Sequence, residues 1–335
     1  GRSLGLKLEK GKMVKIGGEP RQKLDLLVTP NHRMVYFSNR GALKIKPASA
    51  LSKRDCLPQK ARWVGKNYKH VKLIKSGYSP DERIDAGDFA EFLGWYVAEG
   101  CYSKRIRCPG WGHRVVVSQL PGQKKDALRS LLGRLPWKWH EFREGFVASA
   151  KQLRSYVIQC GENKYTKRAP EWIKTASPRL IQRFLHGAIS GDGWLQSGHP
   201  TYATVSKQLA DDIQELFIKS GFFARLTNRA PEPCRLRGTV STNTRTQFWV
   251  RRMAEDRRGL YQRAGSRVIF GEVDYEGMVY CATVPNGTLI VRRNGKTVVC
   301  GNCLEYACAW FDDKIGQPGY PYGLYCNAPT LMLAD

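Results

Sequence analysis

Two segments of the chain, residues 93–100 and 185–193, repeat one uncommon helix design. Each carries two small residues four positions apart and ends on an acidic residue followed by glycine. Small residues at this spacing share one helix face, and a glycine inside a helix costs about 1 kcal/mol relative to alanine. The repetition therefore predicts two helices packed side by side with their backbones close together. The small residues are Gly94, Ala98, Gly187 and Gly191.

The acids that end the two helices are Glu99 and Asp192. A carboxylate at a helix C-terminus is disfavoured by about 0.3 to 1 kcal/mol, and two neighbouring carboxylates repel each other unless a cation lies between them. Oxygen ligands suit Mg²⁺, which activates water and stabilises the leaving oxygen at a phosphate. The pattern thus predicts two or more Mg²⁺ ions shared by Glu99 and Asp192. Each motif taken alone also fits an ordinary helix stop with a solvated acid.

Local patterns predict the elements around these helices. Asp88, with Glu91 three positions later, is expected to cap the first helix, and Ser177 followed by proline is expected to cap the second. A third amphipathic helix is expected over 206–220. Two short strands are expected over 24–37, around a Pro-Asn turn, and a hairpin over 289–299 around Asn-Gly.

The net charge is +26 over 335 residues and is unevenly distributed. Residues 1–80 carry +15, residues 81–270 carry +14, and residues 271–335 carry −3. Basic charge spread over 270 residues favours a polyanion partner, most often nucleic acid, although a basic soluble enzyme remains an alternative. The arginines expected to contact phosphates are Arg105, Arg107, Arg114, Arg225, Arg229, Arg245 and Arg251.

The two helices resemble the paired signature helices of LAGLIDADG homing endonucleases. The similarity extends to residues 167–173 (KRAPEWI), which resemble the K-x-x-P block of that family, and it covers about residues 84–265. It implies two pseudo-symmetric αββαββα halves in a monomer, with saddle-shaped sheets over the major groove of a double-stranded DNA target. It also implies that Glu99 and Asp192 hold the metal and that Lys167 positions water or stabilises charge on the reacting phosphate. A solvated surface lysine is the alternative at 167, and residues 245–268 contain no lysine that matches the second half.

The flanking β-rich segments resemble the Hint fold of inteins, the self-splicing insertions that often carry such endonucleases. Residues 29–32 (TPNH) are similar to the intein T-x-x-H block, in which Thr29 and His32 would polarise the N-terminal scissile peptide. A turn histidine with a structural role is the alternative.

Residues 279–287 and 298–303 (VVCGNC) resemble the two C-terminal splicing blocks. Cys303 would be the nucleophile for transesterification, and Asn302 would cyclise to release the downstream chain. Cys281 stands where such blocks usually carry Asp and would serve as an acid, a base or a branch thiol, unless it is a buried strand cysteine. The usual penultimate histidine is Gly301.

These observations predict an α+β chain in which an all-β Hint-type splicing domain is interrupted by a two-repeat LAGLIDADG endonuclease. The expected boundaries are 1–83 and 266–302 for the splicing domain, 84–265 for the endonuclease, and 303–335 for the host protein. No first splicing residue precedes the T-x-x-H block, which indicates a truncated chain or a split intein joined by an N-terminal fragment in trans.

The expected activities are DNA cleavage and an autocatalytic peptide rearrangement at Asn302-Cys303. Alternatives are a maturase-like DNA- or RNA-binding module with inactive acids, and an autoprocessing Hint protein with an inert insert. No run of 18 apolar residues and no dense cysteine framework is present, so a cytoplasmic, intracellular location without a membrane is expected, as for a phage-encoded protein.

Overall fold

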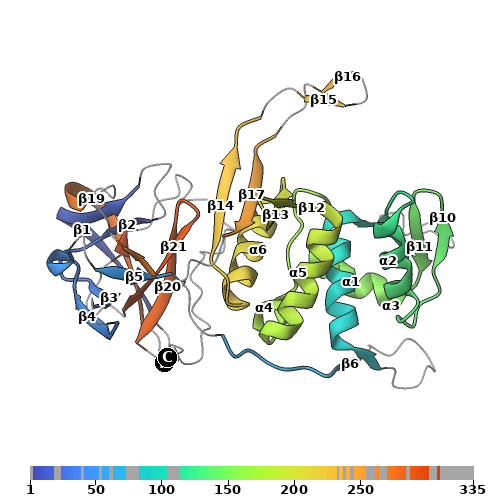
Figure 1. Cartoon of the computed structure of the whole chain (residues 1–335), viewed down its shortest axis with the longest axis horizontal. Coiled ribbons are helices and arrows are strands. Elements are labelled where there is room, and N and C mark those ends of the chain that lie inside the picture. Colours follow the sequence, from blue (N-terminus) through green and yellow to red (C-terminus); the bar gives the residue numbers. More distant parts are fainter. Residues whose placement is uncertain are drawn as a thin grey trace. The chain divides into compact units, whose positions relative to one another are not determined.

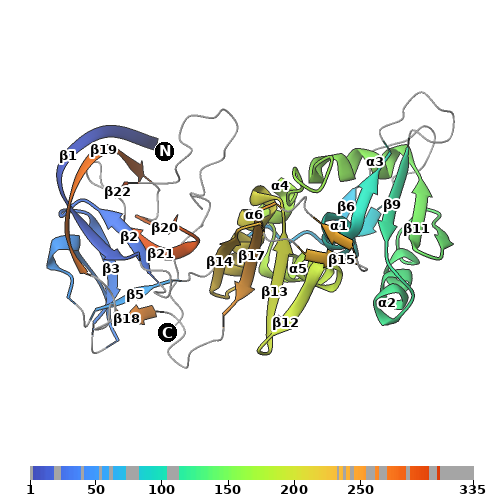
Figure 2. The same ribbon diagram turned by 90° about the horizontal axis from the view of Figure 1, so that it is seen from above.

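The computed structural model divides the chain into two compact units (Figures 1 and 2). Unit 1 comprises Gly1–Trp63, Gly221–Arg225 and Ala254–Asp335, and unit 2 comprises Val64–Ser220 and Leu226–Met253. The structure describes residues 3–18, 24–38, 41–52, 55–59, 63–72, 83–103, 113–231, 234–236, 239–241, 245–253, 261–263, 270–283, 287–301 and 308–309.

Unit 1 consists, in its described residues, of strands and one short 3-10 helix. A closed barrel joins its strands in the order β1-β19-β22-β2, and β1 pairs antiparallel with β19 from Ser3 opposite Thr283 to Ile16 opposite Phe270 (Figure 2). Segments from the two flanks of the chain therefore build one barrel. The barrel elements are β1 (Ser3–Gly17), β2 (Asp25–Val28), β19 (Phe270–Thr283) and β22 (Cys308–Ala309).

A second sheet in unit 1 has the strand order β18-β5-β3-β21-β20, with β4 beside β3. Its core contains Met34, Leu57, Val298 and Cys300, all buried. The elements are β3 (Arg33–Phe37), β4 (Leu43–Pro47), the 3-10 helix η1 (Ala48–Ala50), β5 (Cys56–Pro58), β18 (Tyr261–Arg263), β20 (Thr288–Arg293) and β21 (Lys296–Gly301).

The expected hairpin of β20 and β21 is confirmed. Asn294 and Gly295 have positive φ angles of 46° and 70°, as a two-residue type I′ turn requires, and Arg293 pairs with Lys296 across it. The buried Asp25 carboxylate accepts hydrogen bonds from Arg293 and, at 2.8 Å, from Nδ2 of Asn294. The turn is thus attached to the start of β2.

Unit 2 contains one fold unit twice, because the order helix-strand-strand-helix-strand-strand occurs in each half. The first half has the sheet order β8-β9-β11-β10 and the second has β12-β13-β17-β14, so corresponding strands pair in the same sequence. The expected duplication is confirmed at this level. The first half contains α1 (Ala86–Glu99), β8 (Gly100–Tyr102), β9 (Arg114–Ser118), α2 (Gln123–Leu132), β10 (His140–Phe142) and β11 (Gly145–Ser149). The second half contains α5 (Pro178–Asp192), β12 (Gly193–Gln196), β13 (His199–Thr204), α6 (Lys207–Lys219), β14 (Ala224–Arg229) and β17 (Gln247–Arg252).

Shorter elements connect and precede these halves. They are β6 (His70–Lys72), β7 (Arg83–Asp85), α3 (Lys151–Val157), the 3-10 helix η2 (Ile158–Cys160), α4 (Glu171–Thr175), β15 (Cys234–Leu236) and β16 (Thr239–Ser241). The division of the chain differs from the expected boundary at residue 83. Residues from Val64 onward belong to unit 2, because Lys66 bridges to Ala176 and β6 pairs with β7 directly before α1.

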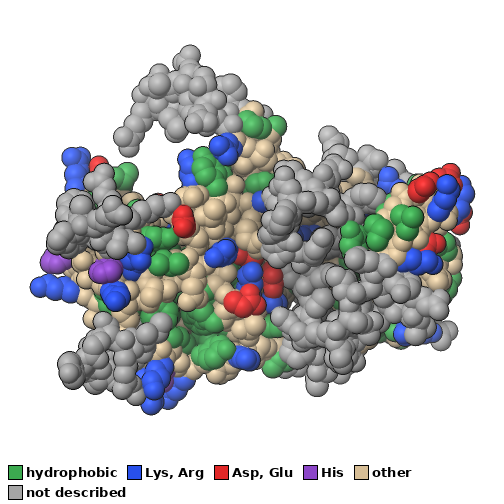
Figure 3. Space-filling view, turned by 180° about the vertical axis from the view of Figure 1, so that it is seen from behind, with side chains coloured by type: hydrophobic (Ala, Val, Ile, Leu, Met, Phe, Trp, Pro, Cys, Tyr) green, Lys and Arg blue, Asp and Glu red, His purple; other side chains and the backbone are tan. Residues whose placement is uncertain are grey.

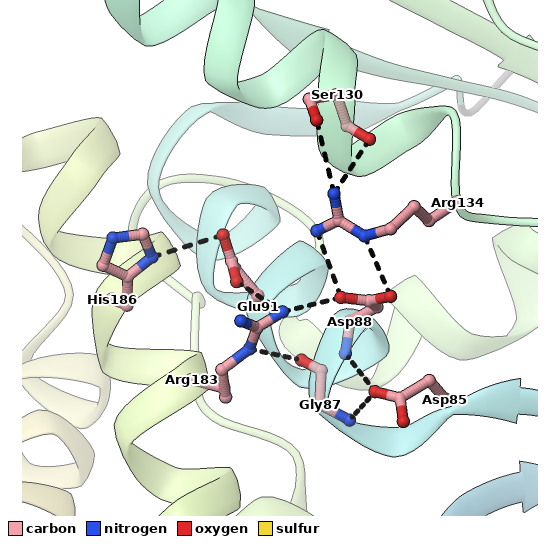
Figure 4. A network of polar contacts seen from close by, with 8 residues as sticks. All are labelled: Asp85, Gly87, Asp88, Glu91, Ser130, Arg134, Arg183 and His186. Atoms are coloured by element: carbon pink, nitrogen blue, oxygen red, sulfur yellow. Dashed lines mark hydrogen bonds and ion pairs between the residues drawn. The ribbon is translucent and has the colours of Figure 1, made fainter.

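The cap of α1 is Asp85 and not the expected Asp88. The Asp85 carboxylate accepts hydrogen bonds from the backbone N–H groups of Gly87 at 2.8 Å and Asp88 at 2.9 Å (Figure 4). The Asp88 side chain instead accepts from Arg134 at 3.0 Å and from Arg183 at 2.6 Å. A carboxylate of the first helical turn therefore joins α1 to α5 and to the segment after α2.

Glu91 continues this polar network on the next turn of α1. It is mostly buried and pairs with Arg183 at 2.9 Å and with Nδ1 of His186 at 3.2 Å (Figure 4). The hydrogen bond from His186 and the charge of Arg183 hold the pKa of Glu91 below its usual value, against the effect of burial. The same bond raises the pKa of His186. A network of ion pairs thus connects α1 and α5 on the N-terminal side of the acids that end the two helices.

On the face shown in Figure 3, the Lys and Arg side chains, in blue, are spread out and do not gather into one patch. Among the helices of the described residues, none has the length and apolar character needed to cross a membrane.

Candidate functional site

The helices α1 and α5 lie against each other along their small-residue faces (Figure 1). A Cβ atom added to Gly94 would lie 2.0 Å from the carbonyl oxygen of Phe184, and one added to Gly187 would lie 2.1 Å from the carbonyl oxygen of Glu91. Each glycine therefore contacts the backbone of the opposite helix, where no side chain fits. The close approach predicted from the spacing of small residues is confirmed.

The same close contact reaches the C-terminal ends of both helices. A Cβ atom on Gly191 would lie 2.5 Å from Cβ of Ala98 and 3.1 Å from Cγ of Glu99. Asp192, the next residue, is close enough to Glu99 for the two charges to interact. Burial first, and then the charge of Glu99, raise the pKa of Asp192 to about 7. Burial also raises the pKa of Glu99.

Lys167 is buried, with 5% of its surface exposed, and is not a solvated surface lysine. Its Nζ donates to the carbonyl oxygens of Tyr96 at 2.9 Å and Gly100 at 2.8 Å, and it lies 3.8 Å from the centre of the Tyr96 ring. Burial lowers the pKa of Lys167 to about 8, and the charge of Asp192 acts in the opposite direction. The ammonium group therefore lies at the C-terminus of α1, within electrostatic range of the acid pair.

Lys124, at the start of α2, is a second cation that sequence reasoning did not select. Its Nζ donates to the carbonyl oxygen of Gly191 at 3.1 Å, and its charge lowers the pKa of both Glu99 and Asp192. No local pattern around residue 124 points to this role, because the contact joins residues 67 positions apart.

A cleft of about 630 Å³, here called the acid cleft, opens beside these groups in unit 2. Asp192 and Lys167 both line it, whereas Glu99 does not. The other lining residues are Val97, Ala98, Gly100, Cys101, Glu162, Asn163, Lys164, Ala203, Thr204, Val205 and Gln247. The Asp192 carboxylate and the low-pKa Lys167 ammonium thus line, together with Glu162 and Lys164, a space large enough for part of a ligand.

One face of the second-half sheet carries aromatic and basic side chains. Tyr202 and Val250 are cross-strand partners with no exposed surface, on the face that α5 and α6 cover. Because side chains alternate along a strand, Trp249 and Arg251 belong to the opposite face. Trp249 packs edge-on against Trp194, with 4.8 Å between ring centres, and the Arg229 guanidinium lies 3.4 Å from its ring centre.

The other expected arginines are more scattered. Arg114 begins β9, Arg225 lies in β14, and Arg245 stacks over the ring of Tyr165 at 4.5 Å. Arg251 donates to the carbonyl oxygen of Gln196 at 3.0 Å. Arg105 and Arg107 lie outside the described residues.

The expected splicing residues are only partly within the described chain. Thr29 and His32 are buried in a turn, in which the Thr29 hydroxyl donates to Oδ1 of Asn31 at 2.7 Å and the His32 N–H donates to the Thr29 carbonyl at 3.0 Å. Cys281 lies on β19 opposite Gly5, and its side chain is outside the described atoms. Asn302 and Cys303 are also outside the described residues.

Residues 179–248, from α5 into β17, match the family model of the LAGLIDADG-like domain. This segment is therefore similar to the LAGLIDADG-like domain. It contains Asp192, Tyr202 and Arg229, and it ends one residue before Trp249.

Curated relatives match the chain over longer stretches at low identity. An uncharacterized protein (MJ1054) of Methanocaldococcus jannaschii is 27% identical over 214 residues, which are 56% of this chain and 23% of that protein. The C-terminal section of an RNA polymerase β subunit of Stigeoclonium helveticum is 23% identical over 83% of this chain and 31% of its own length. A DNA polymerase of a Thermococcus species is 28% identical over 44% of this chain and 9% of its own length. The chain spans less than a third of each of these relatives.

Solved structures of LAGLIDADG proteins also overlap about half of the chain. The crystal structure of I-DmoI in complex with DNA and Ca aligns with 14% identity over 50% of this chain and 83% of that one, at a TM-score of 0.34. The N-terminal LAGLIDADG domain of DUF199/WhiA aligns with 12% identity over 49% of this chain and 74% of that one, at a TM-score of 0.31.

Proposed function

We propose that this chain is a divalent-metal-dependent, site-specific endonuclease for double-stranded DNA, carried within a protein-splicing domain. One observation carries the nuclease assignment. The close packing of α1 and α5 brings two acids, the half-buried Glu99 and the more exposed Asp192, to adjoining helix ends, and the buried Lys167 lines the acid cleft together with Asp192. A protein that only stabilises its fold gains nothing from such an arrangement, because burial and mutual repulsion disfavour both charges.

The acid pair fits a hard divalent cation such as Mg²⁺. Its donors are carboxylate oxygens, and the raised pKa of Asp192 indicates a carboxylate whose charge the protein compensates incompletely. Within the described ranges no three His, Cys, Asp or Glu side chains gather into a metal-binding group, so phosphate and water oxygens would complete the coordination. Glu99 and Asp192 would hold one or more such ions, which polarise the scissile phosphate and lower the pKa of water.

The chain's own cations complete the proposed chemistry. Lys167 is fixed by two carbonyl oxygens and an aromatic ring, so its ammonium group is preorganised to stabilise negative charge that develops on the phosphate. With a pKa of about 8 it also retains its proton near neutral pH and can donate it. Arg229, Arg251 and the Trp194–Trp249 pair would contact the DNA on the sheet face opposite α5 and α6, as would the other arginines expected from the sequence.

The nuclease proposal is tested by first selecting the DNA sequence that the chain binds and then measuring whether that sequence is cut. Random double-stranded DNA is enriched by binding to the full chain in EDTA, and Mg²⁺ is then added to the bound pool. We expect cuts at one defined position in both strands. The Asp192→Asn and Glu99→Gln variants should enrich the same sequence without cutting it. Enrichment by the parent with no cut would favour the maturase-like alternative, and affinity that does not depend on salt would exclude phosphate-dominated binding.

The splicing part of the proposal is supported by the make-up of unit 1. Its barrel pairs strands from the two flanks of the chain, so residues up to Trp63 and from Ala254 form one unit with unit 2 inserted between them. The relatives bear the names of unrelated proteins, including a DNA polymerase and an RNA polymerase subunit, and less than a third of each is shared. An element inserted into different host proteins produces such a pattern.

In this proposal residues 303–335 belong to a host protein, and the chain acts inside the cell as a monomer. Asn302 cyclises and Cys303 is the nucleophile, with Thr29, His32 and Cys281 assisting. Full splicing would draw on an N-terminal intein segment, supplied in cis or in trans. Gly301 carries no side chain that could donate a proton to the reaction, so cyclisation should be slow. A Cβ atom at this position would lie 2.9 Å from the carbonyl oxygen of Arg33.

Asn302 cyclisation needs no upstream residue and can be tested alone. Intact mass is followed over days at neutral pH for the parent and Asn302→Ala. We expect the parent to lose residues 303–335 and the variant to stay whole. Equal loss in both, or cleavage at another bond, would remove the splicing assignment and leave the nuclease proposal unaffected.

A further inference from the structure

Tyr202 lies directly beside the end of α5. It is the cross-strand partner of Gly193, the residue that follows Asp192, and it faces the side of the sheet that α5 covers. The whole residue is buried, with no exposed surface. Its hydroxyl oxygen is also buried and has no hydrogen-bond partner in the part of the chain that the structure describes.

A buried hydroxyl without a partner destabilises a fold, because it loses its bonds to water and gains none. Phenylalanine would fill the same space without that cost. The groups whose charges act on this hydroxyl are Asp192 and Glu99, and together with burial they hold the pKa of Tyr202 well above its usual value. The hydroxyl therefore lies within electrostatic range of both acids, of which Asp192 lines the acid cleft.

We propose that Tyr202 is a positioning residue of the metal site, whose hydroxyl donates a hydrogen bond to the Asp192 carboxylate when that carboxylate holds a divalent cation. This inference rests on the proposed nuclease function. A donor beneath Asp192 fixes the rotation of the carboxylate and leaves its other oxygen directed toward the cleft. Second partners of this kind orient metal-binding carboxylates and raise metal affinity.

The Tyr202 hydroxyl either positions Asp192 at the metal site or has no role there, and the Tyr202→Phe variant distinguishes these two explanations. In both, the variant loses an unpaired polar group, so its melting temperature in EDTA should rise or stay equal. Only a positioning role predicts weaker Mg²⁺ binding and slower DNA cleavage in the variant. We expect a smaller rise in melting temperature when Mg²⁺ is added, and single-turnover cleavage slower by about tenfold to a hundredfold. DNA affinity measured in EDTA should not change.

Thr297→Val is the matched control. Thr297 is buried in unit 1, and among the described residues its hydroxyl also has no hydrogen-bond partner. Valine removes that hydroxyl at nearly constant shape, so the control should match Tyr202→Phe in EDTA and match the parent in its response to Mg²⁺ and in cleavage.

The results separate this inference from the proposed function. Tyr202→Phe with the parent's Mg²⁺ response overturns the inference, whatever the cleavage rate. A parent that binds Mg²⁺ but cuts no DNA overturns the nuclease function, and the Mg²⁺ response still decides the role of Tyr202. A parent whose melting temperature does not respond to Mg²⁺ overturns both.

Discussion

Replacing Gly187 with alanine tests the contact between α1 and α5 on which the site depends. The added Cβ atom would lie 2.1 Å from the carbonyl oxygen of Glu91 and 2.9 Å from the backbone nitrogen of Trp95. Both are main-chain atoms of the opposite helix and cannot rotate away. The helices would have to move apart by more than an ångström, which would also loosen the contact at Gly94.

Two opposing terms set the size of the effect. Alanine is favoured over glycine inside a helix by about 1 kcal/mol. Inserting a methyl group into a packed contact costs about 1 to 3 kcal/mol, and a rigid backbone on the other side places this contact at or above the upper limit. We therefore expect a net loss of about 2 kcal/mol. For a unit of this size, that corresponds to a melting temperature lower by about 4 to 8 °C.

The measurement is urea unfolding of the parent, Gly187→Ala and Gly133→Ala. Gly133 caps the C-terminus of α2 with a φ of −67°, and a Cβ atom there would meet only ordinary contacts at 3.6 and 3.7 Å. The control should be as stable as the parent, or more stable by up to about 1 kcal/mol. A Gly187→Ala protein that equals or exceeds the parent's stability would refute the close helix contact.

Three further predictions concern charge. In EDTA, the parent's free energy of unfolding should fall as the pH rises from about 4 to about 7, because Asp192, with a pKa of about 7, holds a proton in the folded state that the unfolded chain has lost. The urea midpoints of Asp192→Asn should not show this fall. Lys167→Met should slow cleavage by on the order of 10² or more without weakening DNA binding in EDTA, and the parent's cleavage rate should fall above about pH 8, where Lys167 loses its proton. The His186–Glu91 pair raises the pKa of His186, so its contribution is complete below pH 6.5 and is lost as the pH rises further; His186→Ala should therefore approach the parent's stability at pH 9, and a constant difference from pH 6 to pH 9 would contradict this.

The features that local pattern determines were predictable from the sequence. The small residues of α1 and α5 indicated the close helix pair, and Asn294-Gly295 indicated a hairpin. The predicted cap of α1 was wrong. Asp88 and Glu91 have the spacing of a capping box, but their side chains form ion pairs with Arg183 of α5. Asp85 precedes Ala-Gly, a pair that gives no capping signal of its own.

The surroundings of the acids were not predictable in the same way. Lys124 and Tyr202 reach the site from α2 and β13, and a side chain's partner across 67 residues leaves no trace in a single sequence. The burial of Lys167 was equally hidden. It follows from the fold of residues 160–170, where Ser206 donates to the Lys167 carbonyl at 2.6 Å and Asp212 accepts from the Ala169 N–H at 2.8 Å.

The two lysines explain how a pair of acids is tolerated at two helix ends. Lys167 binds the terminal carbonyls of α1, and Lys124 binds the carbonyl of Gly191 in the last turn of α5, so each negative helix end has its own cation. Sequence symmetry between the halves predicts a second catalytic lysine in residues 245–268, which contain none. Symmetry at the site requires only that a cation reach each helix end, and α2 supplies the second one. Burial and the charge of Glu99 still outweigh both lysines, since the pKa of Asp192 remains raised. A divalent cation would supply the missing positive charge.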